Sequence, residues 1–223
     1  HFGATMAELA AMGQSPLFEV HEAAVRTYVR ILENHGASRT RERLDEVAGG
    51  LDVVMPKLPA LLQTTLRIEA ARALLRAGRR DRGIQILDAA LAAMEARGLN
   101  GRYDVANLAG MARAHHEAGG DPERAASLLS QAAELLPAAG TKPSDRVPAS
   151  IALGAAYAAC GEEAAAWQHF RDALRAIRDV HNGRPRHVML TDLCLAIGRA
   201  GYALPEDVGQ ALEAEWGRRG SPW

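Results

Sequence analysis

Five glycines recur along the chain at an almost constant interval: Gly36, Gly78, Gly119, Gly161 and Gly201. The intervals between them are 42, 41, 42 and 40 residues. Each glycine ends an apolar, alanine-rich run with helical periodicity, and a second such run begins a few residues later. A fixed period in this range predicts a stack of helical repeats, in which each unit packs mainly against its neighbours.

The helical runs therefore form pairs, with one glycine between the two members of each pair. We expect helices at about residues 17–35, 38–54, 60–77, 79–96, 103–118, 122–136, 147–160, 162–180, 186–200 and 205–216. Clusters of Gly, Pro and Asn join one pair to the next. No segment shows the alternating period of a strand, so the predicted fold class is all-α.

Composition argues against several kinds of partner. A net charge of −1 over 223 residues gives no basic excess that would attract nucleic acid or an anionic membrane. No apolar run reaches the length of about 18 residues that a membrane span requires. Cys160 and Cys194 lie in Ala- and Leu-rich helical runs, so we expect two buried, reduced thiols and a cytoplasmic location.

The fourth pair of runs carries the most specific pattern of small and aromatic residues. Its members are, in order, Leu153-Gly154, Tyr157, Gly161, Ala166, Phe170 and Ala173-Leu174. This order resembles the tetratricopeptide repeat, in which a small residue on the first helix lets the second helix pack closely. The period of about 42 residues exceeds the usual 34 of that family and resembles the longer repeat of kinesin light chains.

The resemblance implies a right-handed solenoid of about five antiparallel helical hairpins over residues 17–216. It also implies that the small and aromatic residues of the fourth pair are buried between helices. Projecting the period backwards makes residues 1–16 the remnant of a preceding helix. Because the chain begins with His1 and not with Met, we expect the natural protein to extend further upstream. The polar residues 217–223 are expected to form a C-terminal tail.

No arrangement typical of a catalytic or metal site occurs in the sequence. The chain lacks an HExxH motif, a GxSxG motif and a Walker A glycine loop. Adjacent helical residues such as His115 and His116 point about 100° apart and cannot easily share one ion. We expect His115 to pack in the core, and His169, His181 and His187 to be solvated. We therefore assign no catalytic residue, metal ligand or cofactor.

Arginines recur at equivalent positions of the expected first helices, which line the concave groove in tetratricopeptide repeats. Arg30, Arg72 and Arg113 each stand six residues before a turn glycine. The full predicted groove set is Arg26, Arg30, Arg72, Arg76, Arg113, His116 and Arg199. A guanidinium presents a planar fork that matches a carboxylate or a phosphate. The set therefore predicts that an acidic peptide, or a free C-terminal carboxylate, lies along the groove.

Together these expectations describe a non-catalytic module that binds another protein, or a segment of one, in a concave groove. One alternative is a ligand- or peptide-sensing regulatory region attached to an effector domain. Another is an enzyme, which would need a polar pocket with convergent acid and base groups. The arginine recurrence also has a simpler explanation, since arginine is favourable on any exposed helix and Glu33, Glu69 and Glu117 lie nearby.

Overall fold

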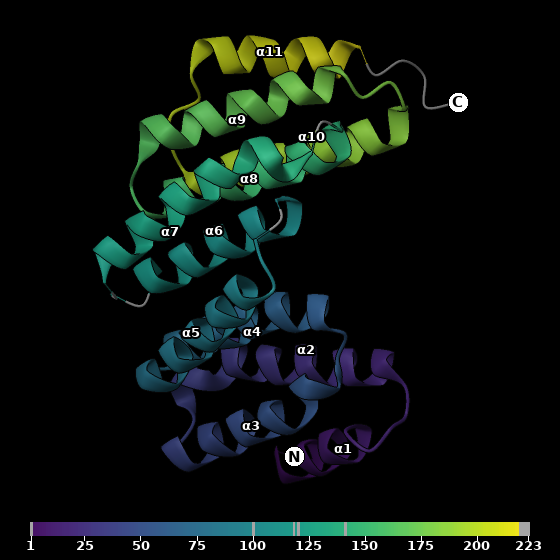
Figure 1. Ribbon diagram of the computed structural model, residues 1–223, viewed down its shortest axis with the longest axis vertical. Coiled ribbons are helices and arrows are strands. Elements are labelled where there is room, and N and C mark those ends of the chain that lie inside the picture. Colours follow the sequence, from purple (N-terminus) through teal and green to yellow (C-terminus); the bar gives the residue numbers. More distant parts are fainter. Residues whose placement is uncertain (1, 100, 118, 120, 141, 219–223) are drawn as a thin grey trace. The chain divides into compact units, whose positions relative to one another are not determined.

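The computed structural model describes residues 2–99, 101–117, 119, 121–140 and 142–218 (Figure 1). These residues form eleven α-helices and three short 3-10 helices and contain no strand, which confirms the all-α prediction. The chain divides into two compact units, residues 1–97 and 98–223, and each is described by itself. Within the described residues, no helix combines the length and the apolar character needed to cross a membrane.

The first unit is built from five α-helices and two 3-10 turns. Their bounds are α1 Phe2–Met12, α2 Phe18–His35, η1 Gly36–Ser38, α3 Arg41–Val54, η2 Met55–Lys57, α4 Ala60–Arg76 and α5 Arg80–Ala96. Helix α2 packs against α3 and α4, and α4 packs against α5. Helix α1 packs against α2 and α3, so the segment before the first expected pair contributes a helix to this unit.

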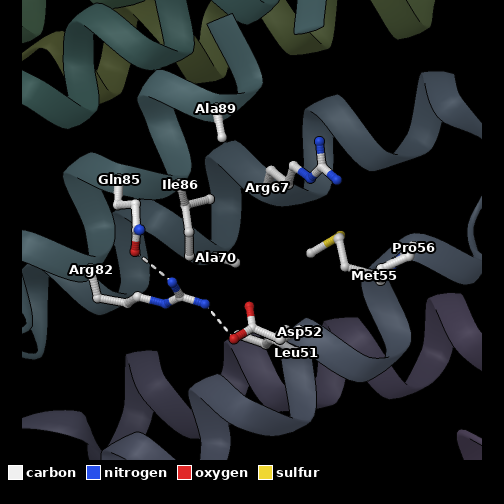
Figure 2. Close-up of a pocket in the computed structure, with 10 residues that line it drawn as sticks. All are labelled: Leu51, Asp52, Met55, Pro56, Arg67, Ala70, Arg82, Gln85, Ile86 and Ala89. Carbon is white, nitrogen blue, oxygen red and sulfur yellow. Dashed lines mark hydrogen bonds and ion pairs between the residues drawn. The ribbon is translucent and has the colours of Figure 1, made fainter. Parts of the chain in front are cut away.

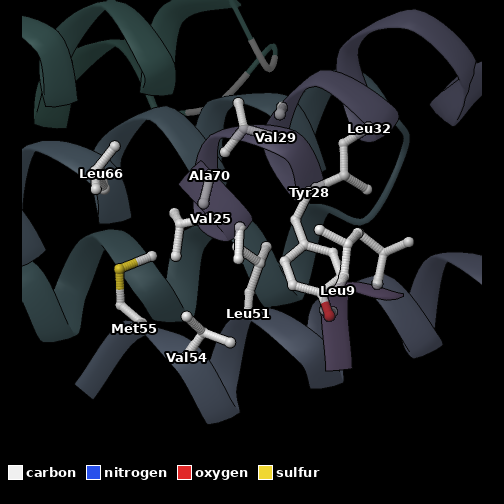
Figure 3. Close-up of a cluster of buried hydrophobic side chains, with 14 of the residues drawn as sticks. Leu9, Val25, Tyr28, Val29, Leu32, Leu51, Val54, Met55, Leu66 and Ala70 are labelled. Atoms are coloured by element: carbon white, nitrogen blue, oxygen red, sulfur yellow. The ribbon is translucent and has the colours of Figure 1, made fainter. Parts of the chain in front are cut away.

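The core of the first unit is formed by side chains from α1 to α4 (Figure 3). Tyr28 on α2 is among its largest members and is only 2% exposed. The Tyr28 ring lies directly against α3 at Gly50, where a Cβ atom would stand 2.5 Å from the ring. The glycine in the middle of α3 is therefore explained by this close approach. Burial also raises the pKa of the Tyr28 hydroxyl above its ordinary value.

The second unit contains the remaining helices. Their bounds are α6 Arg102–Glu117, α7 Pro122–Leu135, η3 Leu136–Ala139, α8 Pro143–Ala159, α9 Glu163–Arg178, α10 Gly183–Ala200 and α11 Glu206–Gly217. Helix α8 packs against α6, α7, α9 and α10, while α11 packs against α9. Residue 118, the expected end of α6, and residues 219–223 of the expected tail lie outside the described residues.

Two helices of this unit begin earlier than expected. Helix α8 begins at Pro143 and α10 at Gly183, whereas the sequence predicts helix starts near residues 147 and 186. Proline suits the first helical position because its φ angle is fixed and its missing N–H has no intrahelical partner there. Asn182 caps α10, since its side chain accepts a hydrogen bond of 3.2 Å from the Arg184 backbone N–H.

The periodic glycines all lie at helix ends, as predicted, and none lies inside an α-helix. Four of them have the left-handed backbone that favours glycine, namely Gly78, Gly119, Gly161 and Gly201. Gly36 differs, because its φ of −57° is right-handed and it begins the turn η1. A Cβ atom at Gly36 would stand 2.5 Å from the Ala77 Cβ atom, so close packing explains the glycine there.

The packing predicted for the fourth pair of runs is confirmed except at Tyr157. Leu153, Phe170 and Ala173 are completely buried. Gly154 on α8 is buried against the Phe170 ring, and a Cβ atom there would stand 2.7 Å from two ring carbons. The small residue on the first helix thus allows the aromatic residue on the second to approach closely. Tyr157 is only half-buried.

Charged residues attach the last helix, α11, to α9. Arg171 donates two hydrogen bonds, of 2.7 and 2.9 Å, to the Asp207 carboxylate. Glu215 is 1% exposed, and its Oε1 atom lies 3.2 Å from Arg178 Nε and 3.0 Å from Arg218 Nη1. The sequence pattern alone did not predict these contacts between α9 and α11.

The prediction of two buried thiols is wrong for Cys194. Cys194 is exposed on α10, whereas its neighbour Leu193 is completely buried. Adjacent helical residues differ by about 100° in direction, so the apolar run alone did not fix which of the two faces the core. Cys160 is half-buried, and both cysteines are free thiols.

Candidate functional site

The clearest candidate site of the second unit is a recess across α6, α8 and α10. It has a volume of about 330 Å³. Its polar lining residues are Arg113 on α6 and Asp192 and Arg199 on α10. The rest of the lining is apolar and consists of Ile151, Ala155, Ala158, Ala159, Leu195, Ala196 and Ala200. The recess therefore has an alanine-rich floor and brings together two of the predicted groove arginines.

The two arginines of this recess differ in their local partners. Arg113 Nε lies 2.6 Å from Glu117 Oε1, one helical turn along α6, so Glu117 offsets part of the Arg113 charge. Arg199 is exposed and forms no ion pair within the described part of the chain. Asp192 precedes Arg199 by seven residues, or about two turns, and lies on the same side of α10.

A second recess, of about 220 Å³, lies between α2 and α4 of the first unit. It is lined by Arg26, Val29, Arg30, Glu33, Glu69 and Arg72, so three more predicted groove residues share one surface. Arg26 Nε lies 2.9 Å from Glu22 Oε1, and Arg26 Nη1 lies 3.6 Å from Glu69 Oε2. The Glu22 and Glu69 carboxylates therefore offset the positive charge of Arg26, and the recess is less basic than its arginines alone would make it.

The pKa of Glu69 is affected by this mixture of charges. Burial raises it above the ordinary value of a glutamate, and the like charges of Glu33 and Glu22 raise it further. The positive charges of Arg26 and Arg72 act in the opposite direction. Burial is the largest of these effects. Arg26 and Arg72 therefore do not fully offset the cost of burying the Glu69 charge.

The remaining predicted groove residues lie outside both recesses. Arg76 is exposed at the end of α4, and His116 is exposed near the end of α6. Arg30 and Arg72 belong to the first unit, whereas Arg113 belongs to the second. The expected row of guanidinium groups through all three residues therefore stays a prediction.

The histidines are partly as predicted. His115 is 6% exposed, which confirms its packing role, and His181 is exposed. His169 was expected to be solvated, but its ring is half-buried and stacks on Tyr157 with 5.3 Å between ring centroids. His187 is also half-buried. Burial lowers the pKa of His169, and the nearby Asp172 carboxylate opposes this change.

We expect His169 to make the free energy of unfolding depend on pH. Because its pKa is lowered in the folded state, the unfolded chain takes up a proton first, near the ordinary pKa of about 6.5. Its contribution should be fully present above pH 6.5 and should be lost as the pH falls from there to the folded-state pKa. His169→Phe keeps a stacking ring without a titrating group. Urea denaturation between pH 7.5 and 5 should show a smaller loss for the variant, and equal losses would contradict this prediction.

Metal-binding side chains are not grouped in the part of the chain that the structure describes. There, no three or more His, Cys, Asp or Glu residues are placed to hold one ion. His21 on α2 is 5% exposed, and neither ring nitrogen has a hydrogen-bond partner among the described residues. Burial without a polar partner favours a packing role, which the sequence pattern did not reveal.

Comparison of the chain with models of protein families, with curated proteins and with solved structures found no match in any of the three. The all-helical class is established by the structure. The resemblance to tetratricopeptide repeats rests on the residue pattern of the helical pairs.

Proposed function

We propose that this chain is a non-catalytic binding module whose helical pairs are repeats of the tetratricopeptide type. Its recess across α6, α8 and α10 would hold a segment of another protein. The observation that carries the proposal is the lining of this recess. Arg113 and Arg199 come from the two helices that flank α8, and the surface between them is lined mainly by alanine.

The lining favours an extended segment with acidic side chains. Alanine methyl groups leave room for the main chain of a bound peptide to approach α8. Guanidinium groups form charge-assisted hydrogen bonds with carboxylates, and these are stronger than bonds between neutral groups. Because all three helices are packed against neighbours, the surface is formed before binding and little ordering is required. Asp192 would favour a peptide with a basic or polar residue at one position.

The same lining supports binding in preference to catalysis. The titratable side chains that line the recess are Arg113, Asp192 and Arg199. A general acid–base pair requires two groups whose protonation can change near the working pH, and arginine remains protonated. Among the described residues that line the recess there is also no Ser, Thr, Cys or Lys that would serve as a nucleophile.

Charge removal should weaken the binding of acidic peptides. We would measure fluorescence anisotropy with labelled decapeptides that share an apolar framework and carry acidic, neutral or basic side chains. The double variant Arg113→Gln/Arg199→Gln should bind the acidic peptide about tenfold more weakly, because two partly exposed charge contacts are lost. Affinity of the unaltered protein should also fall as NaCl concentration rises.

A matched variant separates this effect from a general loss of positive charge. Arg124→Gln removes an exposed arginine from α7, which does not line the recess, and should leave the affinity unchanged. Circular dichroism should show equal helix content in all variants. Equal binding of acidic and basic peptides, or an unaltered affinity of the double variant, would contradict the proposal.

A further inference from the structure

The first unit has another recess, on a part of α4 that the groove arginines do not occupy (Figure 2). It lies among α3, η2, α4 and α5 and has a volume of about 270 Å³. Its apolar surface is formed by Leu51, Met55, Pro56, Ala70, Ile86 and Ala89. Leu51, Met55 and Ala70 are nearly fully buried, so the floor of the recess is part of the packed core.

Two arginines lie at opposite sides of the opening (Figure 2). They differ in the partners that they have among the described residues. Arg82 forms an ion pair with Asp52 and a hydrogen bond of 2.5 Å with Gln85 Oε1. Its charge is thereby largely offset. Arg67 is half-buried and forms no ion pair or hydrogen bond with any residue that the structure describes. The lining therefore has one uncompensated positive charge beside an apolar floor.

This recess is distinct from the one between α2 and α4. Arg67 and Arg72 are five residues apart on α4 and point about 140° away from each other. Arg72 lines the recess that contains Glu69, whereas Arg67 lines the apolar recess. A ligand of the apolar recess would thus contact a separate surface of the same helix.

We infer that the apolar recess binds a small organic acid with an aliphatic body and a single carboxylate. The hydrocarbon part would cover Met55, Ala70 and Ile86, and the carboxylate would pair with the planar guanidinium of Arg67. A volume of about 270 Å³ is slightly below the range of about 300–1,000 Å³ for drug-sized ligands, so the ligand is small. This site is independent of the peptide-binding role proposed for the second unit.

Octanoate is a direct probe of this site. We would follow the methyl NMR signals of Met55 and Ile86 while adding octanoate, octan-1-ol or acetate below the concentrations at which they self-associate. Octanoate should shift both signals with an affinity of about millimolar or tighter, as expected for a ligand of about ten heavy atoms. Octan-1-ol lacks the charge and acetate lacks the chain, so each should bind more weakly.

Three variants test the assigned contacts. Arg67→Gln should weaken octanoate binding by about three- to tenfold and leave octan-1-ol binding unchanged, because only the charged contact is removed. Ala89→Phe adds a ring at an exposed position of the lining and should block both ligands. Arg41→Gln changes an exposed arginine of α3 outside the recess and should have no effect.

The inference would be overturned by equal affinities for octanoate and octan-1-ol in the unaltered protein. It would also be overturned if Arg67→Gln left octanoate binding unchanged, or if Met55 and Ile86 did not respond. Circular dichroism of each variant verifies that the helices are retained. A failure of these tests would leave the peptide-binding proposal intact, since that proposal concerns residues of the second unit.

Discussion

Replacing Phe170 with alanine should lower the free energy of unfolding by about 3–5 kcal/mol, as is typical for truncation of a buried aromatic residue. The Phe170 ring is completely buried on α9. The ring packs edge-on against Trp167 with 5.7 Å between ring centroids. It also lies against the backbone of α8 at Gly154, which has no side chain. Because both neighbours are held in packed helices, the vacated space should close only partly. Urea denaturation measures the loss.

A double-variant cycle tests the reason for this loss. Gly154→Ala alone should destabilise the protein by about 1–3 kcal/mol, since the added Cβ atom would stand 2.7 Å from the Phe170 ring. In the Phe170→Ala background the same change should cost much less because, of the three atoms nearest to the added Cβ atom, only the Ala166 carbonyl oxygen, at 3.2 Å, remains. The two effects should therefore not add. Val188→Ala, at a site 56% exposed, should change stability by less than about 0.5 kcal/mol. A loss below about 1 kcal/mol for Phe170→Ala would contradict its assignment to the core.

Gly101→Ala should be the second strongly destabilising change, with an expected loss of about 2–4 kcal/mol. Gly101 precedes α6 and has a φ of +84°, where a residue with a side chain is strained by about 1–2 kcal/mol. The added Cβ atom would also stand 2.5 Å from the Ala138 carbonyl oxygen and 2.9 Å from its carbonyl carbon. A backbone group cannot move aside as a flexible side chain can, so steric overlap adds to the strain.

Gly161→Ala isolates the backbone contribution at a comparable site. Gly161 has a φ of +82°, but no atom lies within 4 Å of the position that its Cβ atom would occupy. This variant should lose only the strain of about 1–2 kcal/mol. Thermal and urea denaturation of the two variants should therefore rank Gly101→Ala as clearly less stable. If both variants lost the same free energy of unfolding, the contact with Ala138 would not contribute to the effect of Gly101→Ala.

The features that the sequence predicted well are those with local signals. The turn glycines could be placed because a left-handed backbone strongly favours glycine. The closeness of Gly154 and Phe170 could be predicted because the residue order of the fourth pair resembles the tetratricopeptide repeat, in which a small residue on the first helix lets the second helix pack closely. The start of α8 was missed, since Pro143 is compatible with a loop and also with the first helical position. Local sequence does not distinguish these two states.

The candidate sites were less predictable because they depend on contacts between distant segments. The arginine positions predicted one shared groove, and the structure places Arg113 and Arg199 of that set in one recess. They did not predict that Arg26 would pair with Glu69, which is 43 residues away in the chain and on another helix. The apolar recess beside Arg67 was also missed. Its lining comes from four separate elements, and none of the residues that they contribute belongs to a recognisable sequence motif.

Mapping a bound peptide by NMR is the most direct test of whether the recess across α6, α8 and α10 binds a peptide. The alanine methyl signals of the whole chain would be followed while the acidic decapeptide is added. Binding in the recess should shift the signals of Ala155, Ala158 and Ala196, which line it, and should leave those of exposed Ala126 on α7 and Ala164 on α9 unchanged. Shifts at Ala126 or Ala164, with none at the recess alanines, would contradict it.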